Sequence, residues 1–132
     1  MTLVELLTVI VIIGMLGGIA VPAYFHHRDR ARDAQAKAEA RAAQTAAIEI
    51  GQENGGAFDG PGGVTVANLV AREPGLEPED LHVPVVQAET YTVRVRSETG
   101  NTFDVTQHAD GRIALTCASA DDAGCPADGS WD

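Results

Sequence analysis

The chain has 132 residues, enough for one domain, and a formal net charge of −10. Residues 54–132 hold four Arg and thirteen Asp or Glu, a net charge of −9, whereas five bases and five acids cancel in residues 26–53. Because contacts to phosphate need Lys and Arg, this balance argues against stable nucleic-acid binding by the acidic part of the chain.

The first element is an apolar run without a charged residue from Leu6 to Phe25. Twenty helical residues span roughly 30 Å, the thickness of a bilayer's hydrocarbon core. The run is not a typical cleaved secretory signal, because an acid precedes it where such signals carry bases, and no convincing cleavage site follows. Residues 1–25 are therefore predicted to be a helical segment of membrane length, the apolar half of a longer helix.

Helical periodicity continues through residues 26–53, so we expect one helix of about 50 residues and roughly 80 Å. This amphipathic half is rich in Ala, Gln, Lys, Arg and Glu, which favour helix. Asp33 and Lys37 are four residues apart and are expected to form an ion pair along the helix. Gly51, followed by Asn54-Gly55-Gly56, supplies the stop. Small and apolar residues recur at helical spacing and offer a face for a globular domain: Ala43, Ala46, Ala47, Ile50.

Four residues weaken the helix inside the apolar run: Gly14, Gly17, Gly18, Pro22. An interior Gly costs about 1 kcal/mol relative to Ala, and an interior Pro costs ~3 kcal/mol. One interpretation is a kinked membrane helix, where both residues are tolerated and where the Gly14–Gly18 spacing lets helices approach closely. The other is a helix-melting segment that is helical in lipid and extends when subunits pack in a filament. The residues leave both interpretations open.

Glu5 lies one residue before the apolar run, where a charge needs a partner or a proton once the run is buried. The nearest basic side chain, Arg28, is about 34 Å away along a helix. The only early positive charge is the α-amino group of Met1, from the same chain or from a neighbouring copy. An acid at a helix start is also favoured by the helix dipole, by about 0.3–1 kcal/mol, and this simpler explanation stays open.

The segment MTLVELLTVIVIIGMLGGIAVPAY closely resembles the N-terminus of mature type IV pilins, of the type IVa kind, and of related pseudopilins of type II secretion and competence systems. In that family a hydrophobic residue is followed by Thr, Leu, an aliphatic residue and Glu, as in residues 1–5 here. Pro22 and Tyr24 also lie where the family has them. One departure is that the family usually starts with Phe. Either Met1 is the mature residue, or an engineered start replaced Phe.

The resemblance implies a processed chain whose precursor carries a short basic leader, cut by a prepilin peptidase that also N-methylates Met1. It implies that Glu5 attracts the N-terminal amine of an adjacent subunit and sets the register during assembly. The implied partners are many copies of this chain, an assembly ATPase and an inner-membrane platform protein. The subunit would wait in the inner membrane and then join an extracellular pilus on the cell surface.

Residues 54–132 are predicted to form a small β-sheet head. Residues 54–63 and 73–84 are rich in Gly, Pro and polar residues and indicate loops. Thr65 is expected to cap a short helix over residues 66–72, although residues 64–70 also fit a strand.

Alternating apolar residues then predict three antiparallel strands: Tyr91, Val93 and Val95, then Phe103 and Val105, then Ile113, Leu115 and Cys117. Glu98–Asn101 supplies one turn, and Asp110-Gly111 is a strong hairpin signal. A further strand is considered near residues 83–87. The predicted fold is therefore α+β: a long N-terminal helix whose Ala-rich half packs against a small antiparallel sheet of three to four strands.

Cys117 and Cys125 lie close together near the C-terminus and match no metal or haem motif. In an exported protein such a pair is most simply a disulfide that closes a small loop, and two free thiols in a reducing compartment are the alternative. Residues 118–132 show no periodicity and are expected to form a disulfide-tethered loop and tail.

No catalytic constellation is present: the sequence has no P-loop, dinucleotide or HExxH motif. His26 and His27 are adjacent, so they face different directions on a helix and cannot share a metal within one chain. The acids of the tail fit no defined Ca²⁺ loop and are expected to be solvated: Asp121, Asp122, Asp128, Asp132. We predict no enzyme activity, no metal site and no cofactor.

The leading hypothesis is a structural subunit of a type IV pilus, polymerised through its N-terminal helix for adhesion, motility or DNA uptake. The alternative is a pseudopilin of a type II secretion or competence system. A membrane-anchored binding domain without a polymer is a third possibility, and Glu5 in its family context weighs against it. The cysteine pair favours a pilin over the commonest pseudopilin type, which is stapled by calcium instead.

Overall fold

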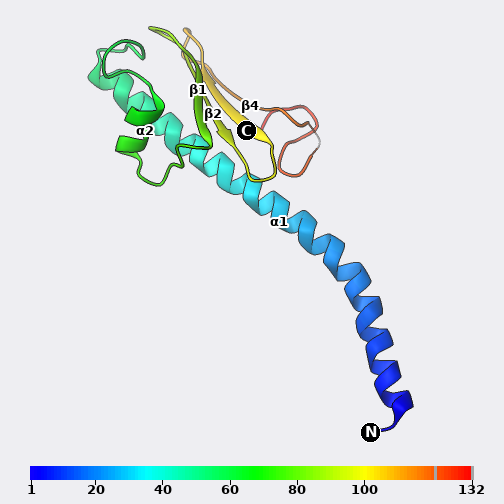
Figure 1. The fold of residues 1–132 in the computed structure, drawn as a ribbon. Helices are drawn as coiled ribbons and strands as arrows, with labels where there is room; N and C mark the ends of the chain where they lie inside the picture. The colour runs from blue at the N-terminus through cyan, green and yellow to red at the C-terminus, as the bar shows by residue number, and fades with distance from the viewer. Residues whose placement is uncertain (121, 132) are drawn as a thin grey trace.

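The computed structural model describes residues 1–120 and 122–131. Within this part of the chain it contains two helices, α1 (Leu3–Glu53) and α2 (Val66–Arg72), and four strands, β1 (Leu81–Val86), β2 (Tyr91–Arg96), β3 (Thr102–Gln107) and β4 (Ile113–Cys117). The predicted α+β class is confirmed, because the second half of the long helix packs against a four-stranded antiparallel sheet. Figure 1 shows a curved rod whose first half extends alone and whose second half carries the head.

α1 is one continuous helix that passes through the predicted weak segment, with Pro22 inside it. It ends at Glu53, and the backbone N–H of Asn54 donates to the carbonyl of Ile50 at 3.1 Å. Gly55 then takes a φ of +70°, a left-handed conformation that glycine adopts readily after a helix. Gly51 has a different role from the predicted one: it is still helical, and a Cβ there would overlap the ring of Phe58.

The sheet is a meander in the order β1-β2-β3-β4. Both predicted turns are present: Ser97 N–H donates to the carbonyl of Asn101 at 2.8 Å, and Gly111 takes a φ of +85° in the β3–β4 turn. The fourth strand also exists and begins earlier than expected, at Leu81. An irregularity interrupts its pairing around Pro84, a residue that cannot donate to the ladder and is tolerated on an edge strand.

The short segment before the sheet is a helix and not a strand. The hydroxyl of Thr65 accepts a hydrogen bond from the backbone N–H of Asn68 at 3.2 Å, which caps α2 as predicted. Leu69 of α2 is buried in the core.

The core lies between the sheet and the amphipathic half of α1. Inward-facing residues of β2 and β3 are fully buried, in the predicted alternation: Tyr91, Val93, Val95, Phe103, Val105. The facing stripe of α1 is mostly alanine, which lets the sheet approach the helix closely: Ala36, Ala40, Ala43, Ala46, Ala47, Ile50. β4 contributes less, because Ile113 is exposed and Leu115 is half-buried.

Residues 118–120 and 122–131 form what we call the C-terminal strap. The predicted disulfide-tethered loop and tail is packed at its end, where the indole of Trp131 is buried edge-on against Phe103 with ring centroids 6.0 Å apart. Backbone hydrogen bonds run from Cys117 N–H to the carbonyl of Gly129 and from Trp131 N–H to the carbonyl of Leu115. The strap therefore covers the outer edge of β4, which explains why these residues are ordered without any periodicity of their own.

Candidate functional site

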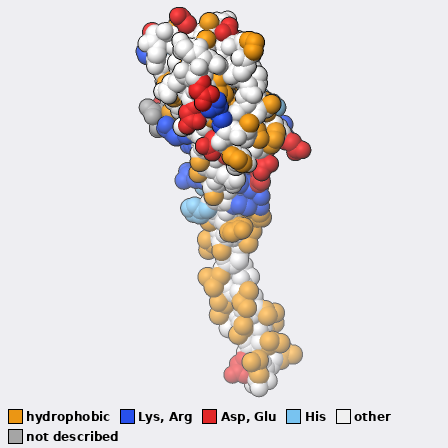
Figure 2. Space-filling view, turned by 90° about the vertical axis from the view of Figure 1, so that its left-hand side faces the viewer, with side chains coloured by type: hydrophobic (Ala, Val, Ile, Leu, Met, Phe, Trp, Pro, Cys, Tyr) orange, Lys and Arg blue, Asp and Glu red, His pale blue; other side chains and the backbone are white. Residues whose placement is uncertain are grey.

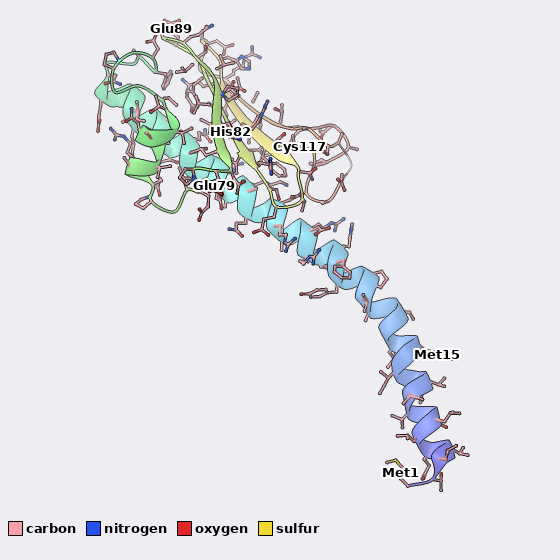
Figure 3. The ribbon with its side chains drawn as sticks, viewed as in Figure 1. Met1, Met15, Glu79, His82, Glu89 and Cys117 are labelled. Atoms are coloured by element: carbon pink, nitrogen blue, oxygen red, sulfur yellow. A yellow bond between two sulfur atoms is a disulfide. The ribbon has the colours of Figure 1, made fainter. Side chains whose placement is uncertain are left out.

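The apolar half of α1 packs against no other segment of the described residues. Every residue from Met1 to Phe25 is exposed except Gly17, which is half-buried. Exposed fractions of its large apolar side chains run from 45% at Phe25 to 99% at Met1. Figure 2 shows this surface as an apolar rod below the head, and Figure 3 places Met1 and Met15 on the part of α1 that extends beyond the head. A soluble monomer rarely exposes so large a contiguous apolar patch.

By length and composition, α1 could cross a membrane within this half. The described structure therefore has one candidate span, close to the N-terminus, and it leads directly into the amphipathic half. Lipid or other copies of the chain are the two surroundings that would remove the apolar half from water.

Glu5 closes a reciprocal cap at the start of α1. The Thr2 hydroxyl accepts from the Glu5 backbone N–H at 3.2 Å, and the Thr2 backbone N–H donates to Glu5 Oε2 at 2.7 Å. The two contacts satisfy helix-end donors that otherwise lack partners. In the single chain Glu5 is exposed, and its local partner is Thr2 instead of the Met1 amine. Its exposure leaves the carboxylate accessible to a second copy.

The glycines of the apolar half are not required by packing inside the chain. A Cβ added at Gly14, Gly17 or Gly18 would meet nothing within 4 Å. Because these glycines have no side chain, the backbone of another helix can approach closely there. The structure shows this segment as helix, and the extended form stays a prediction.

A collar of basic and imidazole side chains separates the apolar half from the head: His26, His27, Arg28, Arg30, Arg32. The Arg28 guanidinium lies 4.7 Å from the centroid of the Phe25 ring and pairs with Asp29 at 3.4 Å. The ring centroids of His26 and His27 are 6.4 Å apart, and the ring planes make an angle of 60°. Aromatic and basic residues at the end of an apolar span are typical of a membrane–water boundary.

Asp33 is the buried acid of the described residues, although its spacing from Lys37 predicted an ion pair along the helix surface. Its side chain is 0% exposed and accepts hydrogen bonds from Thr99 Oγ1 at 2.5 Å, Asn101 Nδ2 at 2.8 Å and the Gly124 backbone N–H at 2.8 Å. The predicted ion pair with Lys37 is therefore wrong, and the Lys37 ammonium lies 5.6 Å from the centroid of the Phe103 ring instead. Asp33 faces the head, where polar donors replace water around its carboxylate.

Burial by itself would raise the pKa of the Asp33 carboxyl. Hydrogen bonds to the charged form outweigh burial, so the pKa lies below its ordinary value of 3.8. The donors that lower it are the side chains of Ser97, Thr99 and Asn101 and the backbone of Gly124. Asp33 is consequently ionised in the folded head at neutral pH.

One sequence signal could have located Asp33. It lies three residues before Ala36 and seven before Ala40, in phase with the buried alanine stripe. A residue on that stripe faces the sheet, so an acid there must find partners in the head. Which residues provide them was not readable, because the donors are 66, 68 and 91 positions away.

The predicted disulfide is confirmed between Cys117 and Cys125, with Cα atoms 5.9 Å apart. Among residues 1–120 and 122–131, no three His, Cys, Asp or Glu side chains gather closely enough to hold a metal ion. Asp122 and Asp128 are exposed to solvent, as expected, whereas Asp121 and Asp132 lie outside the described residues.

No protein-family model matches the sequence, and no curated protein matches it.

Proposed function

We propose that the chain is a structural subunit of a type IV pilus, polymerising through the apolar half of α1 into an extracellular helical filament. The observation that carries the proposal is the continuity of α1, 51 residues long, whose first half is an exposed apolar rod and whose second half is the spine of the head. A simple anchor needs only about 20 residues and no rigid connection to the domain it carries. A continuous helix instead joins the head directly to the segment that would pack in the filament.

The apolar half would first lie in the inner membrane and then exchange lipid for the same segment of other copies. Once these segments pack together, the Glu5 carboxylate loses water and needs a cation. The Met1 α-amino group of an adjacent copy is the partner that the sequence supplies. If Glu5 of one copy meets Met1 of the next, two parallel helices are offset by four residues, about 6 Å along the axis.

The glycines contribute in two ways to this assembly. Their exposed surface allows close helix–helix approach, and their low helix propensity, together with Pro22, makes residues 14–22 the part of α1 that extends at least cost. The resemblance of residues 1–24 to the pilin N-terminus supports the remaining partners of the proposal: a prepilin peptidase that N-methylates Met1, an assembly ATPase and a platform protein.

The experiment is negative-stain microscopy of material sheared from cells that produce the chain, with gold-labelled antibody against the head. Long, thin, labelled fibres are the expected result. A chain that stays in the membrane fraction without fibres contradicts the pilus and indicates a pseudopilin or an anchored domain.

The matched variant is Glu5→Ala, which is expected to enter the membrane normally and to form no normal filaments, because the docking charge is gone. Thr8→Ala, one turn further along the apolar half, is the control and should assemble as the unaltered chain does. Abundant filaments of normal geometry from Glu5→Ala would sink the role given to this carboxylate.

A further inference from the structure

Asp33 joins three segments that are far apart in the sequence: α1, the β2–β3 turn and the C-terminal strap. The Gly124 N–H of the strap donates directly to Asp33 Oδ2 at 2.8 Å. Asn101 provides a second link, because its Nδ2 donates both to Asp33 Oδ2 at 2.8 Å and to the carbonyl of Asp122 at 3.2 Å. One carboxylate on the helix therefore holds the strap at two points.

The disulfide lies immediately beside this contact. Cys125 follows Gly124 and is only 2% exposed, and its backbone N–H donates to the same Asp122 carbonyl at 2.9 Å. At its other end the bridge is attached to Cys117, the last residue of β4. The loop between the two cysteines is thus closed covalently on the sheet side and by hydrogen bonds on the helix side.

We propose that the C-terminal strap is a redox-sensitive element that Asp33 holds in place. The strap stays over β4 only while both the Asp33 contacts and the Cys117–Cys125 disulfide are intact. The disulfide restricts the loop and thereby holds the Gly124 N–H at the carboxylate. The docked loop in turn keeps the Cys125 sulfur away from thiols in solution. This inference goes beyond filament formation and does not depend on it.

Opening the strap requires a reductant, here a dithiol. One of its thiolates attacks one sulfur of the bridge, which breaks the Cys117–Cys125 bond, forms a mixed disulfide and releases the other cysteine as a thiolate. The second thiolate of the reductant then attacks the mixed disulfide and releases the remaining cysteine, and both cysteine thiolates take up protons from water. The dithiol becomes a cyclic disulfide while Cys117 and Cys125 become thiols. The attack needs access to a bridge sulfur, so its rate reports how firmly the loop is docked.

Opening has a structural consequence at the edge of the sheet. The Cys117 N–H and the Leu115 carbonyl, which pair with strap residues, would lose those partners. An uncovered edge strand offers unpaired backbone groups to another chain. The β4 edge would therefore be uncovered only in the reduced form of the chain.

The test measures the rate at which dithiothreitol reduces the full chain in detergent, followed by alkylation and mass spectrometry. Asp33→Asn replaces the charged acceptor by a neutral amide oxygen and should be reduced at least about tenfold faster than the unaltered chain, because hydrogen bonds to a charged group are the stronger ones. Gly124→Ala, a change on the strap, should also be reduced faster than the unaltered chain, because its Cβ would overlap the Cβ of Asp33 and displace the loop. Asp29→Asn, one turn earlier and paired with Arg28 at the surface, is the control and should not change the rate.

Trp131, the single tryptophan of the chain, provides a second readout because it is buried at the end of the strap. Reduction of the unaltered chain should shift its fluorescence emission to longer wavelength while circular dichroism keeps the helix signal. Reduction of Gly124→Ala at the rate of the unaltered chain, or an unchanged Trp131 emission after complete reduction, would overturn the proposal. Gly124→Ala keeps the Asp33 carboxylate, so its reduction rate tests the proposal even if Asp33→Asn does not fold.

Discussion

Asp33 and Glu5, one acid from each half of α1, lie in opposite environments. In the amphipathic half, Asp33 is fully buried and receives three hydrogen bonds from the head. In the apolar half, Glu5 is exposed, and its hydrogen-bond donor is its neighbour Thr2. The amphipathic half is thus an interface completed within one chain, whereas the apolar half exposes a surface that needs lipid or other copies. Substitutions in the two halves should therefore affect the stability of the head very differently.

Asp33→Ala should have the largest effect on the stability of the head. It removes the charged acceptor that Thr99, Asn101 and Gly124 share on the helix, which we expect to lower the free energy of unfolding by about 2–5 kcal/mol. Urea unfolding followed by Trp131 fluorescence measures this. The control Asp29→Ala, at the surface, should stay within about 0.5 kcal/mol. Equal losses from the two variants would remove the distinction between buried and surface acids on α1.

Acid should weaken the head through the same group. The folded-state pKa of Asp33 is below the ordinary 3.8, so the folded head binds fewer protons than the unfolded chain in this range. Its contribution is therefore fully present above the unfolded pKa and is lost as the pH falls through the folded pKa. Below about pH 4, the urea midpoint of the unaltered chain should decrease more steeply with falling pH than the urea midpoint of Asp33→Asn. Parallel curves for the two proteins would contradict the role of this carboxylate.

A glycine-to-alanine change in each half should separate them next. In Gly51→Ala the new Cβ overlaps the Phe58 ring, so the free energy of unfolding of the head should fall by about 1–3 kcal/mol. In Gly14→Ala nothing lies within 4 Å, so the head should be unaffected and the helix should gain up to about 1 kcal/mol. Thermal unfolding by circular dichroism, with Trp131 emission for the head, compares the two. A destabilised head in Gly14→Ala would show that the apolar half has contacts in its own chain.

Thr2→Ala should give the smallest effect, confined to the first turn of α1. Loss of the cap costs about 1 kcal/mol and should speed hydrogen exchange at the Glu5 amide, whose acceptor is the Thr2 hydroxyl. The control is Thr8→Ala, because that hydroxyl donates to the Val4 carbonyl and caps nothing. Unchanged exchange at Glu5 in Thr2→Ala, or an altered head, would contradict a local cap.

Local patterns in the sequence were sufficient to predict most of the fold. The alternation in residues 91–96, the Asp110-Gly111 turn and the Thr65 cap each depend on neighbouring residues, and the structure contains all three. The extra strand β1 was harder to delimit, because it is an edge strand with Pro84 at an irregularity. Edge strands take part of their definition from a partner strand, which a local pattern does not contain.

The misplaced features depend on contacts across the chain. Asp33 and Lys37 fit a helical ion pair when they are considered alone, and only the docked head reveals that Asp33 faces inward. Trp131 is likewise fixed by Phe103 and by the Thr116 carbonyl, which accepts from its indole N–H at 2.9 Å. Glu5 is the reverse case, since the residue was identifiable from sequence while its proposed partner belongs to another copy of the chain.

We propose that other copies of the chain bury the apolar half that one chain leaves exposed. Electron cryo-microscopy of fibres sheared from cells tests this most directly, because it shows which segment occupies the filament core. We expect a core built from residues 1–25 of many copies, with each Glu5 carboxylate beside the Met1 amine of a neighbour and the acidic heads outside. A fibre whose core consists of heads, with the apolar halves at its surface, would contradict it.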